Sequence, residues 1–151
     1  MSDVVIVDTS VLLNLLNVPE YNDDRDAVFE QFEELVKTGA TLFLPLATVL
    51  ETGGHIADVK DGRRRRRSAE VFRGRVTEAI DGKAPWRLVP LPDANELAEW
   101  LESFPERAMQ GISLSDLSQM KLWESLCRKL FGIRVRIWSL DDALRACDRR
   151  P

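Results

Sequence analysis

The chain lacks any apolar segment long enough to cross a membrane. Its longest uncharged apolar stretch, residues 41–50, is interrupted by Pro45, whereas a transmembrane helix needs roughly 20 such residues. The start of the chain does not resemble a secretion signal either, because Asp3 and Asp8 flank its only apolar run. We therefore expect a cytoplasmic protein with no membrane partner.

Cysteine and histidine are scarce, which argues against several kinds of site. The two cysteines, Cys127 and Cys147, fall in helical patterns and are expected to be reduced thiols. A serine hydrolase would have to use His55, the only histidine, and the chain has no Gly-x-Ser-x-Gly turn. His55 follows Glu51 by one helical turn, so it either assists a substrate or a water there or is a partly packed surface residue. Glycine-rich loops that bind nucleotide phosphates are also missing from the sequence.

The composition is that of one globular domain. With 151 residues, of which 44% are hydrophobic and 30% charged, the chain can bury roughly 70% of its unfolded surface in one core. No repeat or low-complexity linker divides it, so we expect a single domain over residues 1–151. Because the net charge is −4, a nucleic acid would have to be held by a local basic patch.

Short apolar runs alternate with amphipathic helical patterns along the whole chain. The predicted strands are residues 4–7, 41–44, 86–91 and 133–137. Strands separated by helices form right-handed crossovers and a mostly parallel sheet with helices on its faces. We predict an α/β protein, a three-layer α/β/α sandwich with a mostly parallel four- to five-stranded sheet. Gly53 and Gly54 weaken the helix after the second strand, which suggests that another segment approaches closely there.

Four acidic residues stand at strand ends or in helices near them. They are Asp8, Glu51, Asp116 and Asp141 (or its neighbour Asp142). Ligand sites of open α/β sheets lie at the carboxyl ends of the strands, so we expect these carboxylates to converge there. Clustered carboxylates raise one another's pKa unless a cation neutralises them, and hard oxygen ligands favour Mg²⁺ or Mn²⁺. Two such ions can activate a water and stabilise the leaving oxygen of a phosphodiester, with Ser10 and Ser139 orienting the carboxylates.

Each acid also has a purely structural interpretation. Asp8 could cap the helix that follows it, and Glu51 could be a solvated helix residue. Asp116 stands three residues after Ser113, which is the spacing of a capping box. One member of the Asp141–Asp142 pair is expected to serve only as the cap of the last helix. The functional interpretation depends on all four positions being present in order.

In that order, the acidic segments resemble the motifs of PIN-domain ribonucleases, the fold of VapC-type toxins. The matching segments are Val-Asp-Thr-Ser-Val-Leu-Leu at 7–13, Leu50-Glu51 with His55-Ile56, Leu114-Ser115-Asp116, and Trp138-Ser139-Leu140-Asp141. The resemblance implies a three-layer α/β/α fold and Mg²⁺- or Mn²⁺-dependent cleavage of RNA. It also implies a homodimer in many cases and inhibition by a cognate antitoxin in many cases.

The resemblance also assigns roles to individual residues. It implies that the catalytic, metal-binding acids are Asp8, Glu51, Asp116 and Asp141. It also implies that the hydroxyls of Ser10 and Ser139 support them. Ser139 stands where Thr is more usual and keeps the hydroxyl. In the family motif the acid follows this hydroxyl residue by two positions, so the spacing from Ser139 favours Asp141 over Asp142. A long basic segment after Glu51 departs from the commonest family pattern and leaves open whether the chain is a toxin.

An unbroken run of arginines stands out in this acidic chain. It comprises Arg63, Arg64, Arg65, Arg66 and Arg67. As an RNA-binding patch, the run would clamp phosphates and supply affinity without sequence information. As a solvated helix start, it would be disfavoured by its own repulsion and by the positive end of the helix dipole.

Two other functional classes are compatible with the same pattern. One is a catalytically inactive RNA- or protein-binding module of the same fold. Two findings would favour it: four acids that lie far apart in the structure, or a thermal stability that Mg²⁺ does not change. The other is a phosphatase or receiver domain that uses Asp8. A dehalogenase-like phosphatase would need a second Asp at position 10, which is Ser.

Overall fold

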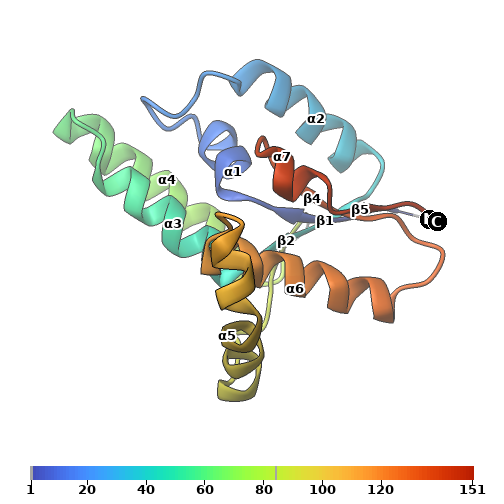
Figure 1. Cartoon of the computed structure of the whole chain (residues 1–151). Coiled ribbons are helices and arrows are strands. Elements are labelled where there is room, and N and C mark those ends of the chain that lie inside the picture. The colour runs from blue at the N-terminus through green and yellow to red at the C-terminus, as the bar shows by residue number, and fades with distance from the viewer. Residues whose placement is uncertain (1, 84) are drawn as a thin grey trace.

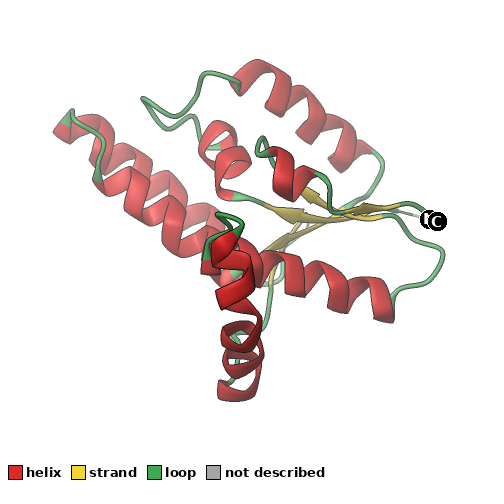
Figure 2. Ribbon diagram, viewed as in Figure 1, coloured by secondary structure: helices red, strands yellow, loops and turns green. Residues whose placement is uncertain are grey.

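Strands and helices alternate along the chain in the computed structural model, which describes residues 2–83 and 85–151 (Figures 1 and 2). The first half contains β1 (Val4–Val7), α1 (Thr9–Leu15), α2 (Arg25–Lys37), β2 (Thr41–Leu44), α3 (Leu46–Ala57) and α4 (Gly62–Ile80). The second half contains β3 (Trp86–Leu88), α5 (Ala94–Met109), α6 (Leu114–Lys129), β4 (Val135–Trp138), α7 (Asp142–Arg145) and β5 (Asp148–Arg149).

The strands form one mostly parallel sheet in the order β3-β2-β1-β4-β5. The central strand β1 is parallel to β2 on one side and to β4 on the other, and β3 continues the parallel part beside β2. Only β5 is antiparallel, and its Arg149 pairs with Val135 of β4, which in turn pairs with Val4 of β1. The predicted mostly parallel sheet is confirmed, and the carboxyl ends of β1 and β4 are neighbours.

Different helices cover the two faces of the sheet, because successive side chains of a strand point in opposite directions. Val5 of β1 packs on one face with Leu12 of α1. The next residue, Ile6, packs on the other face with Ile137 of β4 and Met120 of α6. Figures 1 and 2 show the sheet nearly edge-on, with α2 above it and α6 below it. This arrangement is compatible with the predicted three-layer sandwich.

Glycines follow the ends of two helices. Gly39 follows α2 with a φ of 77°, and Gly82 follows α4 with a φ of 69°. Backbone of this left-handed kind is favourable for glycine, which has no Cβ to clash with the preceding carbonyl. Gly39 and Gly82 therefore provide the turns that end α2 and α4.

Several predicted boundaries are wrong. β3 ends at Leu88 instead of residue 91, since Pro90 has no N–H to donate to a neighbouring strand. β4 begins at Val135 instead of residue 133, after the chain turns through Gly132 with a φ of 71°. Cys147 lies beyond the end of α7 and not within a helix.

The expected close approach at the double glycine of α3 is also wrong. A Cβ at Gly53 would meet the ring of Phe72 at 3.8 Å, an ordinary van der Waals contact, and nothing lies within 4 Å of a Cβ at Gly54. The two glycines therefore lower the helix propensity of α3 without making room for another segment.

The short strand β5 was not predicted, because Asp148 and Arg149 show no alternation of apolar residues. Side chains hold it in place instead. Asp148 accepts two hydrogen bonds from the guanidinium of Arg134, at 2.9 and 2.7 Å. Arg149 donates to the carbonyls of Cys127 and Ile133, at 2.6 and 2.8 Å. Ionic and backbone contacts at the end of the chain therefore add the fifth strand.

The helix α5 projects away from the sheet and packs mainly against α6 (Figure 1). None of its residues is buried, and Leu97 and Leu101 are half-exposed. Pro105 lies inside it and removes one helical hydrogen bond. Neither α5 nor any other helix in the described part of the chain is long and apolar enough to cross a membrane.

Candidate functional site

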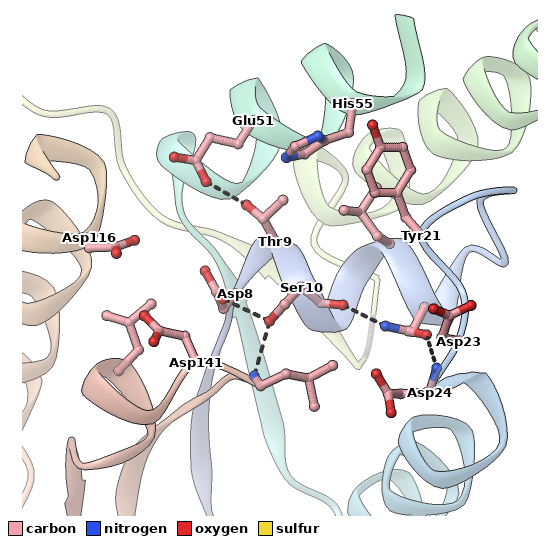
Figure 3. A pocket seen from close by; sticks show the side chains of 14 residues that line it. Asp8, Thr9, Ser10, Tyr21, Asp23, Asp24, Glu51, His55, Asp116 and Asp141 are labelled. Carbon is pink, nitrogen blue, oxygen red and sulfur yellow. Dashed lines mark hydrogen bonds between the residues drawn. The ribbon is translucent and has the colours of Figure 1, made fainter. Parts of the chain in front are cut away.

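A pocket of about 380 Å³ opens at the carboxyl end of β1. All four predicted acids line it: Asp8 after β1, Glu51 on α3, Asp116 on α6 and Asp141 after β4 (Figure 3). The other lining residues are Thr9, Ser10, Leu13, Asn14, Tyr21, Asp23, Asp24, His55, Leu140 and Leu144. Asp8 and Asp141 are more than 130 residues apart in sequence, and their carboxylates nevertheless lie in one cavity.

Asp8 is the most firmly held of the four acids. It is only 5% exposed, and its Oδ2 accepts hydrogen bonds from Ser10 at 2.9 Å and Ser139 at 2.7 Å. Its Oδ1 accepts one from the Nε2 of Gln119 at 2.9 Å. A carboxylate offers roughly four lone-pair positions, so about one position, on Oδ1, is left for a further partner. Asp8 occupies the N-cap position of α1, but its side chain makes no cap hydrogen bond, so the capping interpretation is wrong.

The two serines also connect the ends of β1 and β4. Their hydroxyl oxygens lie 3.4 Å apart. The Oγ of Ser10 accepts the backbone N–H of Leu140 at 3.0 Å, and the Oγ of Ser139 accepts that of Asp141 at 2.9 Å. Each hydroxyl thus donates to Asp8 and accepts from the loop after β4. Both serines therefore lie where the sequence predicts, as hydrogen-bond donors to a carboxylate of the pocket.

Glu51 is positioned by the first turn of α3. Thr48 is fully buried and donates its hydroxyl to the carbonyl of Val7 at 2.7 Å, which ties α3 to the end of β1. Glu51 follows three residues later, so it lies on the same side of the helix. Its Oε2 accepts a hydrogen bond from the hydroxyl of Thr9 at 3.0 Å (Figure 3). Glu51 is therefore a half-buried pocket residue and not a solvated one.

Asp116 combines a capping backbone with a side chain in the pocket. Its N–H donates to the Oγ of Ser113 at 3.0 Å, as the capping-box spacing predicts. Burial raises the pKa of its carboxyl to about 6, and the negative charges of Asp8, Glu51 and Asp141 add to the increase. Burial first, and the neighbouring negative charges second, therefore disfavour the ionised form of Asp116.

The adjacent acids Asp141 and Asp142 have different surroundings. Asp141 lines the pocket and also caps α7, with its carboxylate 3.4 Å from the N–H of Ala143. The side chain of Asp142 is 97% exposed and lies 3.7 Å from Arg145. Asp141 is therefore the member of the pair that the structure brings to the other acids.

Gln119 is a pocket-supporting residue that the sequence analysis missed. It is fully buried, it donates to Asp8, and its Oε1 has no hydrogen-bond partner among the described residues. The signal that could have found it is its spacing, since it follows Asp116 by three residues and shares a face of α6 with it. Tyr21, Asp23 and Asp24 were also missed as pocket residues, because they belong to the loop and turn before α2.

The arginine run lies outside this pocket. It forms the exposed first turns of α4, at the tip of the hairpin made by α3 and α4 (Figure 1). Arg65 donates to the carbonyls of Val59 and Lys60, and Arg66 pairs with Glu70 at 3.0 Å. Arg63, Arg64 and Arg67 extend into solvent, and the described residues offer their side chains no hydrogen bond or ion pair. The run therefore adds no positive charge to the pocket wall.

The pocket is rich in oxygen ligands and has no lysine or arginine in its lining. Within residues 2–83 and 85–151, no three His, Cys, Asp or Glu side chains are grouped so as to hold a metal ion by themselves. Mg²⁺ usually keeps several waters and takes one or two protein carboxylates together with substrate phosphates. The open position on Asp8 and the mutual repulsion at Asp116 fit a cation of this kind.

Comparison of the chain with models of protein families and with curated proteins finds no match. The geometry and chemistry of the pocket therefore carry the functional conclusion.

Proposed function

We propose that the chain is a divalent-metal-dependent endoribonuclease of the PIN-domain type. The observation that carries the proposal is the meeting of Asp8, Glu51, Asp116 and Asp141 in one pocket at the carboxyl ends of neighbouring parallel strands. The order of the motifs along the sequence, which resembles that of PIN-domain ribonucleases, supports the same conclusion. The toxin of a toxin–antitoxin pair, acting as a homodimer, is the biological setting that the resemblance favours.

The four carboxylates would hold Mg²⁺ or Mn²⁺, and Asp8 would contribute through Oδ1. When bound, such ions supply an activated water and stabilise the leaving oxygen of a phosphodiester. In the reaction, the water oxygen adds to phosphorus, the P–O3′ bond breaks and the 3′ oxygen takes up a proton. The products would carry 5′-phosphate and 3′-hydroxyl ends.

The remaining pocket residues orient the acids. Ser10, Ser139 and Gln119 fix both oxygens of Asp8, so that its carboxylate does not have to reorganise when charge develops on the substrate. Thr9 holds one oxygen of Glu51. In the pocket without a cation, Asp116 exchanges its carboxyl proton near neutral pH, because its pKa is about 6. A cation bound beside it would favour the ionised form.

The test is cleavage of a mixed structured RNA pool in the presence of Mn²⁺. We expect wild-type protein to cut the RNA and both EDTA and the variant Asp8→Asn to abolish cutting, with folding checked by circular dichroism. Asp142→Asn is the matched control, because Asp142 neighbours a site acid but is exposed outside the pocket. Mass spectrometry of the purified protein first excludes a bound antitoxin.

A catalytically inactive RNA- or protein-binding module is the second candidate. The observation in its favour is that no ready-made group of three metal ligands is found among the described residues. Partner-free wild-type protein that cuts no RNA in Mn²⁺, and whose melting temperature is unchanged by Mn²⁺, would establish this candidate over the nuclease.

A further inference from the structure

Two aromatic rings meet at the end of the pocket away from Asp116 (Figure 3). Tyr21, from the loop between α1 and α2, and His55, from α3, lie with their ring centroids 4.8 Å apart and their planes tilted by 50°. Both line the pocket and both are partly exposed to it. The pair therefore presents a ring surface inside a cavity whose other end is acidic.

The loop that carries Tyr21 is fixed in place. Glu20, the preceding residue, has a φ of 75°, a backbone conformation that non-glycine residues rarely adopt. Its Oε2 accepts the backbone N–H of Lys60 at 2.8 Å, which ties the loop to the turn between α3 and α4. The loop that carries Tyr21 is thus attached to the neighbouring turn by a contact that is independent of the ring pair.

The charges around the ring pair select what can bind there. Asp23 and Asp24 lie on one side of it and Glu51 lies one helical turn before His55, whereas no lysine or arginine lines the pocket. A phosphate group placed against the rings would face carboxylates with no cation to balance them. A neutral, flat group has no such repulsion and gains stacking with the rings.

We propose that Tyr21 and His55 form a stacking platform for one nucleobase of single-stranded RNA, next to the phosphate that is cut. The proposal rests on the proposed function of the same pocket and assigns two of its residues to base binding. Bases in a duplex are already stacked on both faces, whereas unpaired bases are free to stack on aromatic side chains. Because His55 and Glu51 share one face of α3 and line the same pocket, a base on the platform would lie about one helical turn from the acids.

The composition of the chain makes the platform directly observable. His55 is the only histidine and Tyr21 the only tyrosine in the sequence, so proton NMR of the untagged protein gives one set of ring signals for each. The titration uses an oligoadenylate, whose bases stack well, in the presence of Ca²⁺ to screen the carboxylates. Mass spectrometry confirms that the oligoadenylate is intact afterwards. Inorganic polyphosphate, which carries the charge without any base, is the parallel probe.

We expect oligoadenylate, and not polyphosphate, to shift the ring signals of both residues upfield. Tyr21→Ala should weaken oligoadenylate binding, measured by fluorescence anisotropy, by at least about fivefold, because each base–aromatic contact contributes substantially to affinity. Tyr21→Phe keeps the ring and should bind as wild type does. Polyphosphate should bind Tyr21→Ala and wild-type protein equally well.

Three results would overturn the platform. They are ring signals that move no more with oligoadenylate than with polyphosphate, absence of oligoadenylate binding, and a loss in Tyr21→Phe as large as in Tyr21→Ala. Cleavage of RNA measured in parallel separates this inference from the proposed function. Cutting without movement of the ring signals removes the platform and keeps the nuclease, whereas movement without cutting removes the nuclease and keeps a single-strand binding site.

Discussion

The acidic pocket and the arginine tip of the α3–α4 hairpin carry charge in opposite ways. In the pocket, Asp8 is 5% exposed and three donors fix its two oxygens. At the tip, Arg63, Arg64 and Arg67 extend into solvent. Fixed charge in a half-buried site suits chemistry that depends on position, whereas mobile exposed charge gives affinity with little geometric demand. The comparison separates residues expected to govern turnover from residues expected to govern binding.

Among substitutions that leave the four acids intact, the largest effect is expected from Gln119→Leu, which removes one fixed donor and keeps the volume of the side chain. We expect cleavage to fall about 10- to 100-fold, as it does when a supporting partner of a metal ligand is lost. The free energy of unfolding should fall by only about 1 kcal/mol, because removal of the unpartnered Oε1 partly offsets the loss of the donor to Oδ1 of Asp8. Single-turnover cleavage and urea denaturation measure the two quantities. Gln110→Leu, on the surface after α5, is the control, and equal cleavage by both variants would contradict the supporting role.

The next effect concerns the two serines that share Oδ2 of Asp8. Ser10→Ala and Ser139→Ala should each lower the free energy of unfolding by about 1–2 kcal/mol, because a buried acceptor loses one of its donors. The double variant should lose more than the sum, since Oδ2 is then left with no partner. A double-mutant cycle in urea measures this coupling. If the losses in the free energy of unfolding of the two single variants add up to that of the double variant, the two hydroxyls stabilise Asp8 independently of each other.

The third effect is the pH dependence caused by Asp116 in protein kept free of divalent cations. Its pKa of about 6 in the folded state lies above the ordinary 3.8, so the folded state binds the proton more tightly than the unfolded state. The free energy of unfolding should therefore fall as the pH rises from about 4 to about 6. Asp116→Asn should remove much of this fall and be stabilising by about 1 kcal/mol at pH 7.5, after allowance for solvent screening.

Chemical denaturation across this pH range measures the Asp116 effect. Added Mn²⁺ is the control for the wild type, since a bound cation balances the carboxylates and stabilises the folded state. An Asp116→Asn profile that runs parallel to the wild-type profile at every pH would assign the dependence to other groups.

The smallest effect is expected at the arginine tip. Each of Arg63→Gln, Arg64→Gln and Arg67→Gln should weaken RNA binding by roughly threefold and reduce the dependence of affinity on salt by a slope of about 0.7. Arg66→Gln is the matched control, because its guanidinium is already paired with Glu70. Anisotropy titrations over a range of salt concentrations measure both. Equal salt slopes for all four variants and the wild type would place the RNA elsewhere.

The four parallel strands and the four acids could be predicted because each has a local signal. Apolar runs mark β1 and β2, and the acids follow strands or cap helices in an order that resembles one family. The choice of Asp141 over Asp142 also had a local signal, the spacing from Ser139, and the structure places Asp141 in the pocket.

The parts that were missed depend on contacts between distant segments. Gln119 supports Asp8 across 111 positions of sequence, and nothing in its own neighbourhood marks it except its spacing from Asp116. Tyr21 reaches the pocket because of the turn at Glu20, a residue type that rarely adopts positive φ and so gives no warning of it. β5 exists because Arg134 and Asp148 pair, which no apolar pattern reveals.

The position of β5 also has a consequence for the order of the chain itself. Since Val135 pairs with Val4 on one side and with Arg149 on the other, the first and last strands lie only two strand spacings apart, about 10 Å. Figure 1 shows β5 beside the strands of the sheet, on the side of the molecule away from the helical hairpin. A short glycine-rich linker could join the two ends of the chain, and new ends could be opened in the turn between α3 and α4, where no strand pairing would be cut. Such a circular permutant should keep the circular dichroism spectrum and cooperative unfolding of the original chain, because spatial neighbours, and not their order of synthesis, define this fold.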